Sequence, residues 1–260
     1  MTRVLVFGAL GRMGERVRAA IEAEPEAVLG AAIEAPGHPK LGLELEDGVR
    51  LTADVAAGLE AADVAIAFAP PAPTVALVRA AAERGVACAV GTTGLEPAQR
   101  AELERLAGKI PMVVTANFSV AVIVLKQLVQ LAAERLGPGY DAEIVEAHHA
   151  RKVDAPSGTA LELAERVAAG RGEPGGGKQI HARDGITGAR EAGTIGIQSL
   201  RGGDNPGEHT VLFLGPGERL ELAHRAATRD HFARGALRAA LWLRGRAPGS
   251  YDMEQVLGLR

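Results

Sequence analysis

The sequence predicts an α/β protein in which a doubly wound parallel sheet is joined to a second, α+β domain with an open mixed sheet. As far as residue 115, short apolar runs alternate with helical stretches, which is typical of a parallel sheet with buried strands. A glycine-rich turn connects the first of these runs to the first helical stretch. Beyond residue 190, three strand-like runs follow one another without a helical stretch between them, and this order favours an antiparallel or mixed sheet.

The composition is that of one large or two modest folded domains, with 260 residues of which 47% are hydrophobic and 23% charged. A single cysteine, Cys88, excludes an intramolecular disulfide and fits a reducing cytosol, so we expect a cytoplasmic protein. The formal net charge of −3 leaves no basic surplus for a nucleic-acid partner. The first apolar run is too short for a signal peptide, and polar residues and a proline interrupt the apolar stretch at 110–125, so we expect no membrane association.

The glycine turn after the first strand is the first candidate for ligand binding. Gly8, Gly11 and Gly14 form the pattern G-x-x-G-x-x-G, one residue longer in its first spacing than the usual G-x-G-x-x-G. The second strand ends at Glu34, where a dinucleotide-binding fold places the carboxylate that holds the adenosine ribose, and the pyrophosphate would lie at the helix N-terminus. This context predicts a Rossmann-like nucleotide site. The alternative is that the glycines only turn a tight corner.

Two further turns of the first domain follow strands. The expected elements are strands at 4–7, 28–33, 64–68, 86–90 and 112–115, helices at about 13–24, 74–84 and 97–107, and a loop at 35–46. Gly91-Thr92-Thr93-Gly94 follows the fourth strand, and Thr115-Ala116-Asn117-Phe118 ends the fifth. Ligands of open α/β sheets bind at the carboxyl ends of the strands. Both segments are therefore candidates for nucleotide contact, and the alternative for each is a plain turn.

A domain boundary is expected near residue 119, where a long apolar helix begins. The expected elements beyond it are helices at 120–136, 159–167 and 231–244, strands at 142–147, 193–200, 209–214 and 218–224, and a glycine-rich loop at 172–177. Gly137-Pro138-Gly139 stops the long helix. We assign residues 1–119 and 230–260 to the first domain and 120–229 to the second. Because few helices remain to cover the flat second sheet, we expect a homo-oligomer built through it.

Titratable residues gather in the loop between the strand at 142–147 and the following helix. His148 can titrate near neutrality and Lys152 can donate a proton when its pKa is lowered, so the pair suits acid chemistry on a carboxylated substrate. Ser157-Gly158-Thr159 provides a hydroxyl cap and free amide groups for a carboxylate at the helix N-terminus. A metal is not expected, because His148 and His149 are adjacent and Cys88 lies far away in sequence. The alternative is that the histidine pair is only exposed polar surface.

Six segments of the chain carry a resemblance to a known family. They are residues 8–14, 91–94, 116–120, 146–149, 152–161 and 207–210. The longest, K-V-D-A-P-S-G-T-A-L, is highly specific. On these segments the chain resembles the 4-hydroxy-tetrahydrodipicolinate reductase family, also called dihydrodipicolinate reductase. The resemblance implies reduction of a cyclic dicarboxylate by NADH or NADPH in the diaminopimelate route to lysine, a dinucleotide-binding first domain, and a homotetramer formed through the sheet of a substrate-binding second domain.

The resemblance also implies roles for individual residues. His148 matches the family's catalytic acid/base and Lys152 its proton donor. The matching substrate-binding positions are His149, Ser157, Gly158, Thr159 and Thr93. The matching nucleotide-binding positions are Gly8, Ala9, Leu10, Gly11, Arg12, Met13, Glu34, Gly91, Thr92, Thr93, Thr115, Ala116, Asn117 and Phe118.

One position departs from the family pattern and bears on the choice of cofactor. Members commonly place an arginine directly after the ribose-binding acid, whereas this chain has Ala35. Glu34 can accept hydrogen bonds from the ribose hydroxyls of NADH but would repel the 2′-phosphate of NADPH. Lys40 or Arg12 could supply the missing charge, yet we expect NADH to be preferred.

Two other classes of protein share parts of this pattern. Another two-domain nicotinamide enzyme, such as an amino-acid or semialdehyde dehydrogenase, would share the first 115 residues but has no need of His-His-x-x-Lys before Pro-Ser-Gly-Thr. A non-enzymatic nucleotide sensor would share the fold and lack proton donors. Turnover of the substrate that the resemblance implies would separate the three.

Overall fold

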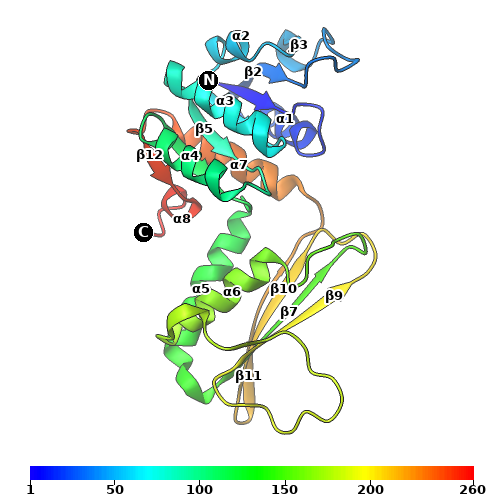
Figure 1. The fold of residues 1–260 in the computed structure, drawn as a ribbon, viewed down its shortest axis with the longest axis vertical. Coiled ribbons are helices and arrows are strands. Elements are labelled where there is room, and N and C mark those ends of the chain that lie inside the picture. The colour runs from blue at the N-terminus through cyan, green and yellow to red at the C-terminus, as the bar shows by residue number, and fades with distance from the viewer. The chain divides into compact units, whose positions relative to one another are not determined.

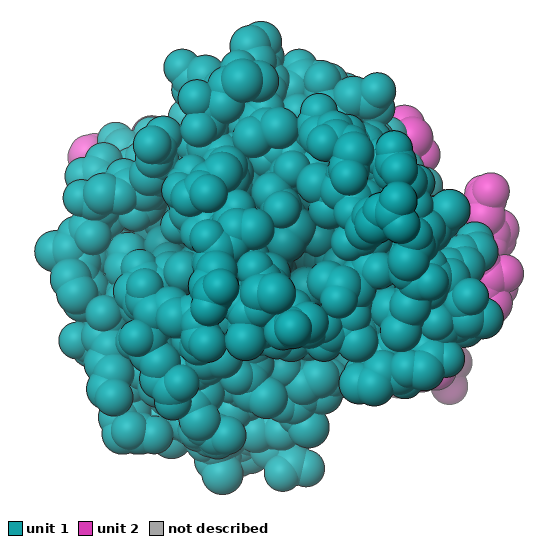
Figure 2. All heavy atoms as spheres, turned by 90° about the horizontal axis from the view of Figure 1, so that it is seen from above, with its two compact units in different colours: residues 1–120, 229–260 teal, residues 121–228 magenta. Residues whose placement is uncertain are grey.

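The computed structural model describes residues 1–260, the side chain of Pro174 excepted, and the chain divides into two compact units. Unit 1 comprises Met1–Val120 and Arg229–Arg260, and unit 2 comprises Ala121–Thr228 (Figure 1, Figure 2). Each unit has its own cluster of buried apolar side chains. None of the described helices has the length and apolarity that crossing a bilayer requires.

Unit 1 contains a seven-stranded parallel sheet with the strand order β12-β6-β5-β4-β1-β2-β3. Its strands are β1 (Thr2–Phe7), β2 (Ala27–Ile33), β3 (Leu51–Thr52), β4 (Val64–Ala67), β5 (Ala87–Val90), β6 (Pro111–Val114) and β12 (Gly249–Tyr251). The order runs outward from β1 in one direction through β2 and β3, and in the other through β4, β5 and β6. This reversal is the switch point of a doubly wound sheet, beside which ligands bind. The predicted Rossmann-like sheet is confirmed.

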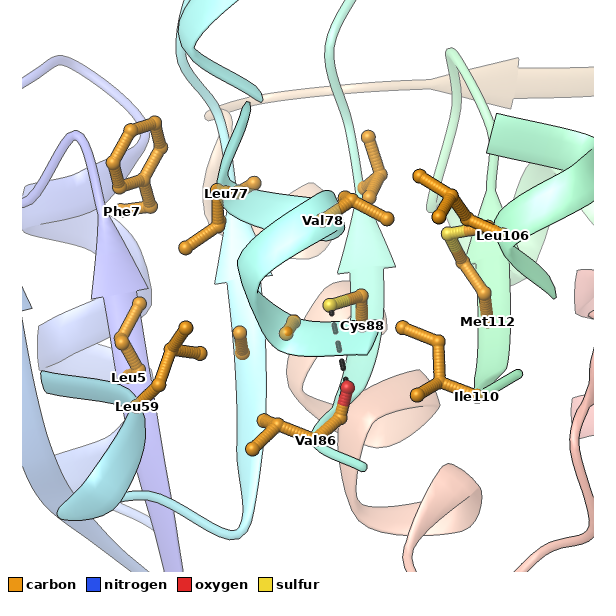
Figure 3. Close-up of a cluster of buried hydrophobic side chains, with 14 of the residues drawn as sticks. Leu5, Phe7, Leu59, Leu77, Val78, Val86, Cys88, Leu106, Ile110 and Met112 are labelled. Carbon is orange, nitrogen blue, oxygen red and sulfur yellow. Dashed lines mark hydrogen bonds between the residues drawn. The ribbon is translucent and has the colours of Figure 1, made fainter. Parts of the chain in front are cut away.

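Helices bury both faces of this sheet. They are α1 (Gly14–Glu22), α2 (Val55–Glu60), α3 (Pro71–Arg84), α4 (Pro97–Ala107), α7 (Asp230–Leu243), α8 (Met253–Val256) and the 3-10 turn η1 (Glu46–Gly48). Leu5, Phe7 and Cys88 belong to a cluster that α2, α3 and α4 complete (Figure 3). Val4 and Val6 alternate with them along β1 and are also buried, and α1 and α7 pack against each other and against the strands.

The structure contains short elements that the sequence analysis missed, and one helix begins earlier than expected. The missed elements are β3, α2, β12 and α8 of unit 1 and β8 (Gln179–Ile180) of unit 2. The three strands have only two or three residues each, too few for a periodic pattern. The helix expected from residue 74 begins at Pro71. Proline is tolerated in a first helical turn because the N–H groups there have no intrahelical acceptor.

Unit 2 contains a five-stranded mixed sheet with the order β11-β10-β7-β9-β8. Its elements are α5 (Val120–Leu136), which starts at the end of unit 1, η2 (Gly137–Gly139), β7 (Asp141–His148), α6 (Gly158–Gly170), η3 (Pro174–Gly176), β8, β9 (Ile195–Arg201), β10 (Glu208–Gly215) and β11 (Glu218–Arg225). β7 and β8 run parallel to β9, whereas β10 is antiparallel to β7 and β11. The expected open mixed sheet is confirmed.

The two faces of this sheet differ. Val129 of α5 and Leu163 of α6 pack on Ile144, Ile197 and Phe213, so two helices cover one face. The alternate strand residues form the opposite face, called the open face below, which no described helix covers. Its members include Glu143, Val145, Gln198, Leu200, Thr210, Leu212 and Leu214. Leu200 is 57% exposed and Leu214 36% exposed, which leaves apolar surface on the open face.

Candidate active site

The glycine turn of unit 1 joins β1 to α1 in a tightly packed backbone arrangement. Gly8 has φ 82°, a left-handed conformation that favours glycine, and its N–H donates to the carbonyl of Ile33 at 2.9 Å. A Cβ at Gly14 would lie 2.8 Å from the carbonyl carbon of Ala9, so only glycine lets α1 start against the turn. The first N–H groups of α1 therefore lie at the carboxyl end of β1, where a helix can bind an anion.

Glu34 lies against the same turn. Its carboxylate accepts the N–H of Leu10 at 2.8 Å and that of Ala35 at 3.2 Å. The end of β2 and the glycine turn are thus held together by a carboxylate at the position expected to meet a ribose. Ala35 brings no charge to this place, and Lys40 is an exposed residue of the following loop.

A cavity of about 470 Å³ in unit 1 brings most of the other expected segments together. It is lined by Arg12, Met13, Phe68, Ala69, Pro70, Gly91, Thr92, Thr93, Ala116, Phe118, Arg229 and Phe232. The Thr92 hydroxyl donates to the carbonyl of Ala69 at 3.0 Å, and Asn117 donates its N–H to the Thr115 hydroxyl at 3.1 Å, which fixes both strand ends. A larger cavity, about 760 Å³, lies between α1 and α7 and is lined by none of the residues expected to bind nucleotide.

Two lining residues of the smaller cavity, Arg229 and Phe232, were missed by the sequence analysis. Both lie where the chain re-enters unit 1, far in sequence from the glycine turn. A cation at a domain boundary is a weak signal, and only the fold places Arg229 in the same cavity as Arg12.

In unit 2, a buried carboxylate organises the end of β7. Glu146 is fully buried, and its Oε2 lies 2.6 Å from Nδ1 of His148. Two guanidinium nitrogens of Arg201 donate to its two oxygens, each at 2.7 Å, and the N–H of Ser157 donates at 3.1 Å. Burial alone would raise the pKa of Glu146, but hydrogen bonds from Arg201, Ser199 and His148 outweigh it and lower the pKa to about 2. Glu146 is therefore ionised at neutral pH.

His148 shares this face of the sheet with a second histidine, His209 of β10. Burial lowers the pKa of His148 and outweighs the opposite effect of Glu146, so the imidazole is mostly neutral near pH 7. The rings of His148 and His209 meet edge to face with centroids 5.2 Å apart. Nε2 of His209 lies 3.0 Å from the Ser157 hydroxyl, and burial lowers the pKa of His209 to about 3. No role for His209 followed from the sequence, because its partners lie on other elements.

The loop after β7 carries the other expected residues. The Lys152 ammonium group lies 2.8 and 2.7 Å from the two carboxylate oxygens of Asp154. His149 donates its N–H to the carbonyl of Asn205 at 2.9 Å, and its Nδ1 is buried without a hydrogen-bond partner among the described residues. Ser157 caps α6 by accepting the N–H of Ala160 at 3.2 Å, so the predicted hydroxyl cap is confirmed. The first turn of α6, with Gly158 and Thr159, thus begins next to Glu146 and His209.

Two local sites are therefore present, each within one unit. In unit 1 the glycine turn, Glu34 and the ends of β5 and β6 form a setting for a dinucleotide. In unit 2 a neutral histidine, a lysine and a capped helix N-terminus suit proton transfer to a carboxylated ligand. Among the described side chains, no group of three or more His, Cys, Asp or Glu residues could hold a metal ion. These features define a two-domain α/β oxidoreductase of the dinucleotide-binding type.

Comparison with known proteins narrows this class to one family. The model described as "Dihydrodipicolinate reductase, N-terminus" matches residues 2–118, and "Dihydrodipicolinate reductase, C-terminus" matches residues 121–257. The chain belongs to the dihydrodipicolinate reductase family, as its motifs indicated.

Individual relatives agree with the family models. The chain is 46% identical to the 4-hydroxy-tetrahydrodipicolinate reductase of Anaeromyxobacter dehalogenans strain 2CP-1, over 100% of this chain and 99% of the relative. It is 47% identical to that of Desulfotalea psychrophila over the same shares. The dipicolinate-bound dihydrodipicolinate reductase from Paenisporosarcina sp. TG-14 is 25% identical with a TM-score of 0.78, and 97% of each chain is covered.

Proposed function

We propose that this protein reduces 4-hydroxy-tetrahydrodipicolinate to tetrahydrodipicolinate with a nicotinamide dinucleotide, in the diaminopimelate route to lysine. The substrate takes up one hydride and one proton in this reaction, and its 4-hydroxyl group leaves as water. The observation that carries the proposal is the cluster of His148, Glu146 and Ser157 at the N-terminus of α6, in a chain that matches dihydrodipicolinate reductase over both units. The full-length relatives bear the name of this activity.

Unit 1 fits the dinucleotide. The missing side chain of Gly14 leaves the start of α1 close to the turn, where residues 8–13 would hold the pyrophosphate. Glu34 would accept the ribose hydroxyls, and the segments at 91–93 and 115–118 would line the nicotinamide end. The bound dinucleotide supplies a hydride to a ring carbon of the substrate. Ala35 leaves the 2′-phosphate of NADPH without a matching cation, so NADH is the preferred cofactor.

Unit 2 supplies the proton and holds the substrate. Lys152 and His148 are the proton donors for the ring atom that gains electron density. Backbone and hydroxyl donors of Ser157, Gly158 and Thr159 hold one carboxylate through charge-assisted hydrogen bonds, with His149 as a further contact. Thr93, which belongs to unit 1, is the remaining substrate-binding position that the family resemblance implies. The Paenisporosarcina relative, which binds the planar dicarboxylate dipicolinate, supports a dicarboxylate as the ligand class.

The assembly belongs to the same proposal. The open face of the unit 2 sheet exposes Leu200 and Leu214 next to half-buried Leu212. Pairing of this face with other copies would cover the apolar surface, and we propose a cytoplasmic homotetramer formed in this way.

The proposed function is tested by following NADH oxidation with the freshly formed condensation product of pyruvate and aspartate semialdehyde. Turnover that requires this product supports the reductase. Turnover with an amino acid or a semialdehyde alone would indicate a different dehydrogenase. Nucleotide binding without turnover of any of these compounds would indicate a sensor. Lys178→Ala is the matched control for Lys152→Ala in this assay. Lys178 pairs with Glu191 in the same unit, much as Lys152 pairs with Asp154.

A further inference from the structure

We propose that Glu146, clamped by Arg201, is a positioning residue that holds His148 with Nδ1 protonated and Nε2 available to the substrate. This inference rests on the proposed function for its kinetic consequence, and on unit 2 alone for its structural one. The two carboxylate oxygens of Glu146 make four polar contacts. Oε2 meets Nδ1 of His148 at 2.6 Å and a guanidinium nitrogen of Arg201 at 2.7 Å. Oε1 meets the other guanidinium nitrogen at 2.7 Å and the N–H of Ser157 at 3.1 Å.

The charge state of Glu146 determines which imidazole nitrogen carries the proton. An ionised carboxylate is only an acceptor, and Glu146 is fully buried between Arg201 and His148. The contact of 2.6 Å with Nδ1 is therefore an Nδ1–H donor bond. In the neutral ring, Nε2 then carries the lone pair. No hydrogen bond joins Nε2 to another described residue. His148 can therefore take up a proton at Nε2 and deliver it from there, while Glu146 compensates the positive charge.

Arg201 extends this arrangement to the loop that carries Lys152. Beyond its two bonds to Glu146, the guanidinium group donates to the carbonyl of Asp154 at 2.7 Å. Asp154 in turn pairs with Lys152 through its carboxylate. Arg201 thus binds both the carboxylate of Glu146, which contacts His148, and the backbone of Asp154, which pairs with Lys152. A bidentate guanidinium is suited to this because its donors lie in one rigid plane.

Four charged or titratable groups face His148, and each comes from a different element. Glu146 lies on the same strand, Arg201 on β9, His209 on β10, and Lys152 on the loop after β7. Glu146 is the only one of the four that favours the protonated ring. A Cβ at Gly207 would lie 2.9 Å from Nε2, so glycine keeps the region next to this nitrogen clear.

A purely structural ion pair is the alternative, and the same strand contains a natural control. Glu143 lies on the open face of β7 and is also bridged by two arginines, Arg183 and Arg190, at 2.7 to 2.9 Å. The pKa of Glu143 is likewise lowered, because these arginines outweigh the effect of burial. It differs from Glu146 in having no histidine among its hydrogen-bond partners. Glu143→Gln therefore removes a comparable carboxylate without touching His148.

The first test needs no turnover and uses the parent protein. Histidine labelled with nitrogen-15 reports the tautomer of each ring, and His148→Gln identifies the His148 signal. Above its pKa, His148 is expected to be the Nδ1–H tautomer. An Nε2–H tautomer would overturn the proposal, whatever reaction the protein catalyses and whether or not any variant folds.

The second test measures the consequence of removing the charge. Glu146→Gln is expected to lower the pKa of His148 and to lower kcat about 10- to 100-fold, a loss of the size found when carboxylates that orient metal-binding histidines are removed. The KM for NADH is expected to stay unchanged, because the nucleotide contacts lie in unit 1.

Two further variants serve as controls. Glu146→Asp, which keeps the charge, is expected to recover part of kcat, and Glu143→Gln is expected to leave the His148 titration unchanged. An unshifted His148 titration in Glu146→Gln, or an equal loss of kcat in Glu146→Asp, would show that Glu146 is structural only. Absence of turnover in the parent would instead contradict the proposed function and leave the tautomer result standing.

Discussion

Lys152 is the residue whose loss is expected to slow the proton transfer without affecting cofactor binding. It lies in unit 2, on the loop after β7, whereas the glycine turn and Glu34 lie in unit 1. Lys152→Ala is expected to lower kcat by about 10²- to 10⁴-fold, the usual contribution of a general acid. The KM for NADH should hardly change. Steady-state kinetics measure both values, and a loss in kcat below about tenfold would remove Lys152 from the proton-transfer step.

Ala35 is the residue on which the proposed preference for NADH over NADPH rests. The neighbouring Glu34 would repel a 2′-phosphate, and the alanine offers no cation to balance it. We expect a higher kcat/KM with NADH in the parent, and Ala35→Arg should raise kcat/KM for NADPH by adding a bidentate phosphate donor. Kinetics with both nucleotides at one fixed substrate concentration provide the comparison. A parent that favours NADPH would point to Lys40 or Arg12 as the phosphate ligand.

His209 links stability to pH. Burial, with a further contribution from His148, lowers the pKa of His209 to about 3, against about 6.5 in an unfolded chain. Between these pH values the unfolded chain binds a proton at this histidine that the folded chain does not. The free energy of unfolding therefore keeps its full value above pH 6.5 and decreases as the pH is lowered. His209→Gln should reduce the slope of stability against pH between about pH 6.5 and 5 by up to 1.4 kcal/mol per unit. Urea unfolding at several pH values measures this slope, and equal slopes for parent and variant would contradict the assignment.

The start of α1 shows how one glycine permits a binding element. Because a Cβ at Gly14 would overlap the backbone of Gly8 and Ala9, Gly14→Ala should destabilise unit 1 by about 1–3 kcal/mol and weaken NADH binding. Gly139→Ala is the control, since no described atom lies within 4 Å of the added carbon. Thermal unfolding and calorimetric NADH titration follow the two effects. Unchanged NADH affinity in a folded Gly14→Ala variant would show that the turn can shift without cost.

The long elements could be predicted from the sequence, and the short ones could not. Apolar runs and helical spacing located the central strands and every helix of nine or more residues. β3, β8 and β12 lie at the edges of their sheets and pair over two or three residues, so their conformation depends on a neighbouring strand and not on a local pattern. Pro71 and Pro73 lie outside the helix that was predicted from residue 74, but in the structure they belong to the first turn of α3.

In the candidate site too, only features that are local in the sequence could be predicted. His148, Lys152 and Ser157 could be selected because they are close together in sequence. The roles of Glu146 and His209 depend on Arg201 and Ser157, which are 55 and 52 positions away along the chain. The sheet register places His148 beside Arg201 and Glu146 beside His209, and the start of α6 adds Ser157. Sequence spacing contains no signal for such pairs.

At the scale of the whole molecule, the open face of unit 2 accounts for the proposed assembly. Leu200→Glu would place a charge on the open face that other copies are proposed to cover, so the tetramer should dissociate. Leu259→Glu, at a residue 40% exposed in unit 1, is the matched control and should stay tetrameric. Light scattering after gel filtration gives the mass of each variant. A monomeric parent, or a Leu200→Glu variant with the parent's mass, would contradict the role of this face.

The proposed reaction transfers a hydride from NADH to a cyclic imine derived from pyruvate and aspartate semialdehyde. Its most direct test uses NADH carrying deuterium at both positions of nicotinamide C4, with the product analysed by mass spectrometry. We expect one deuterium in the tetrahydrodipicolinate ring, with much slower formation of this product by Lys152→Ala. A product without deuterium, or oxidation of NADH without this product, would contradict it.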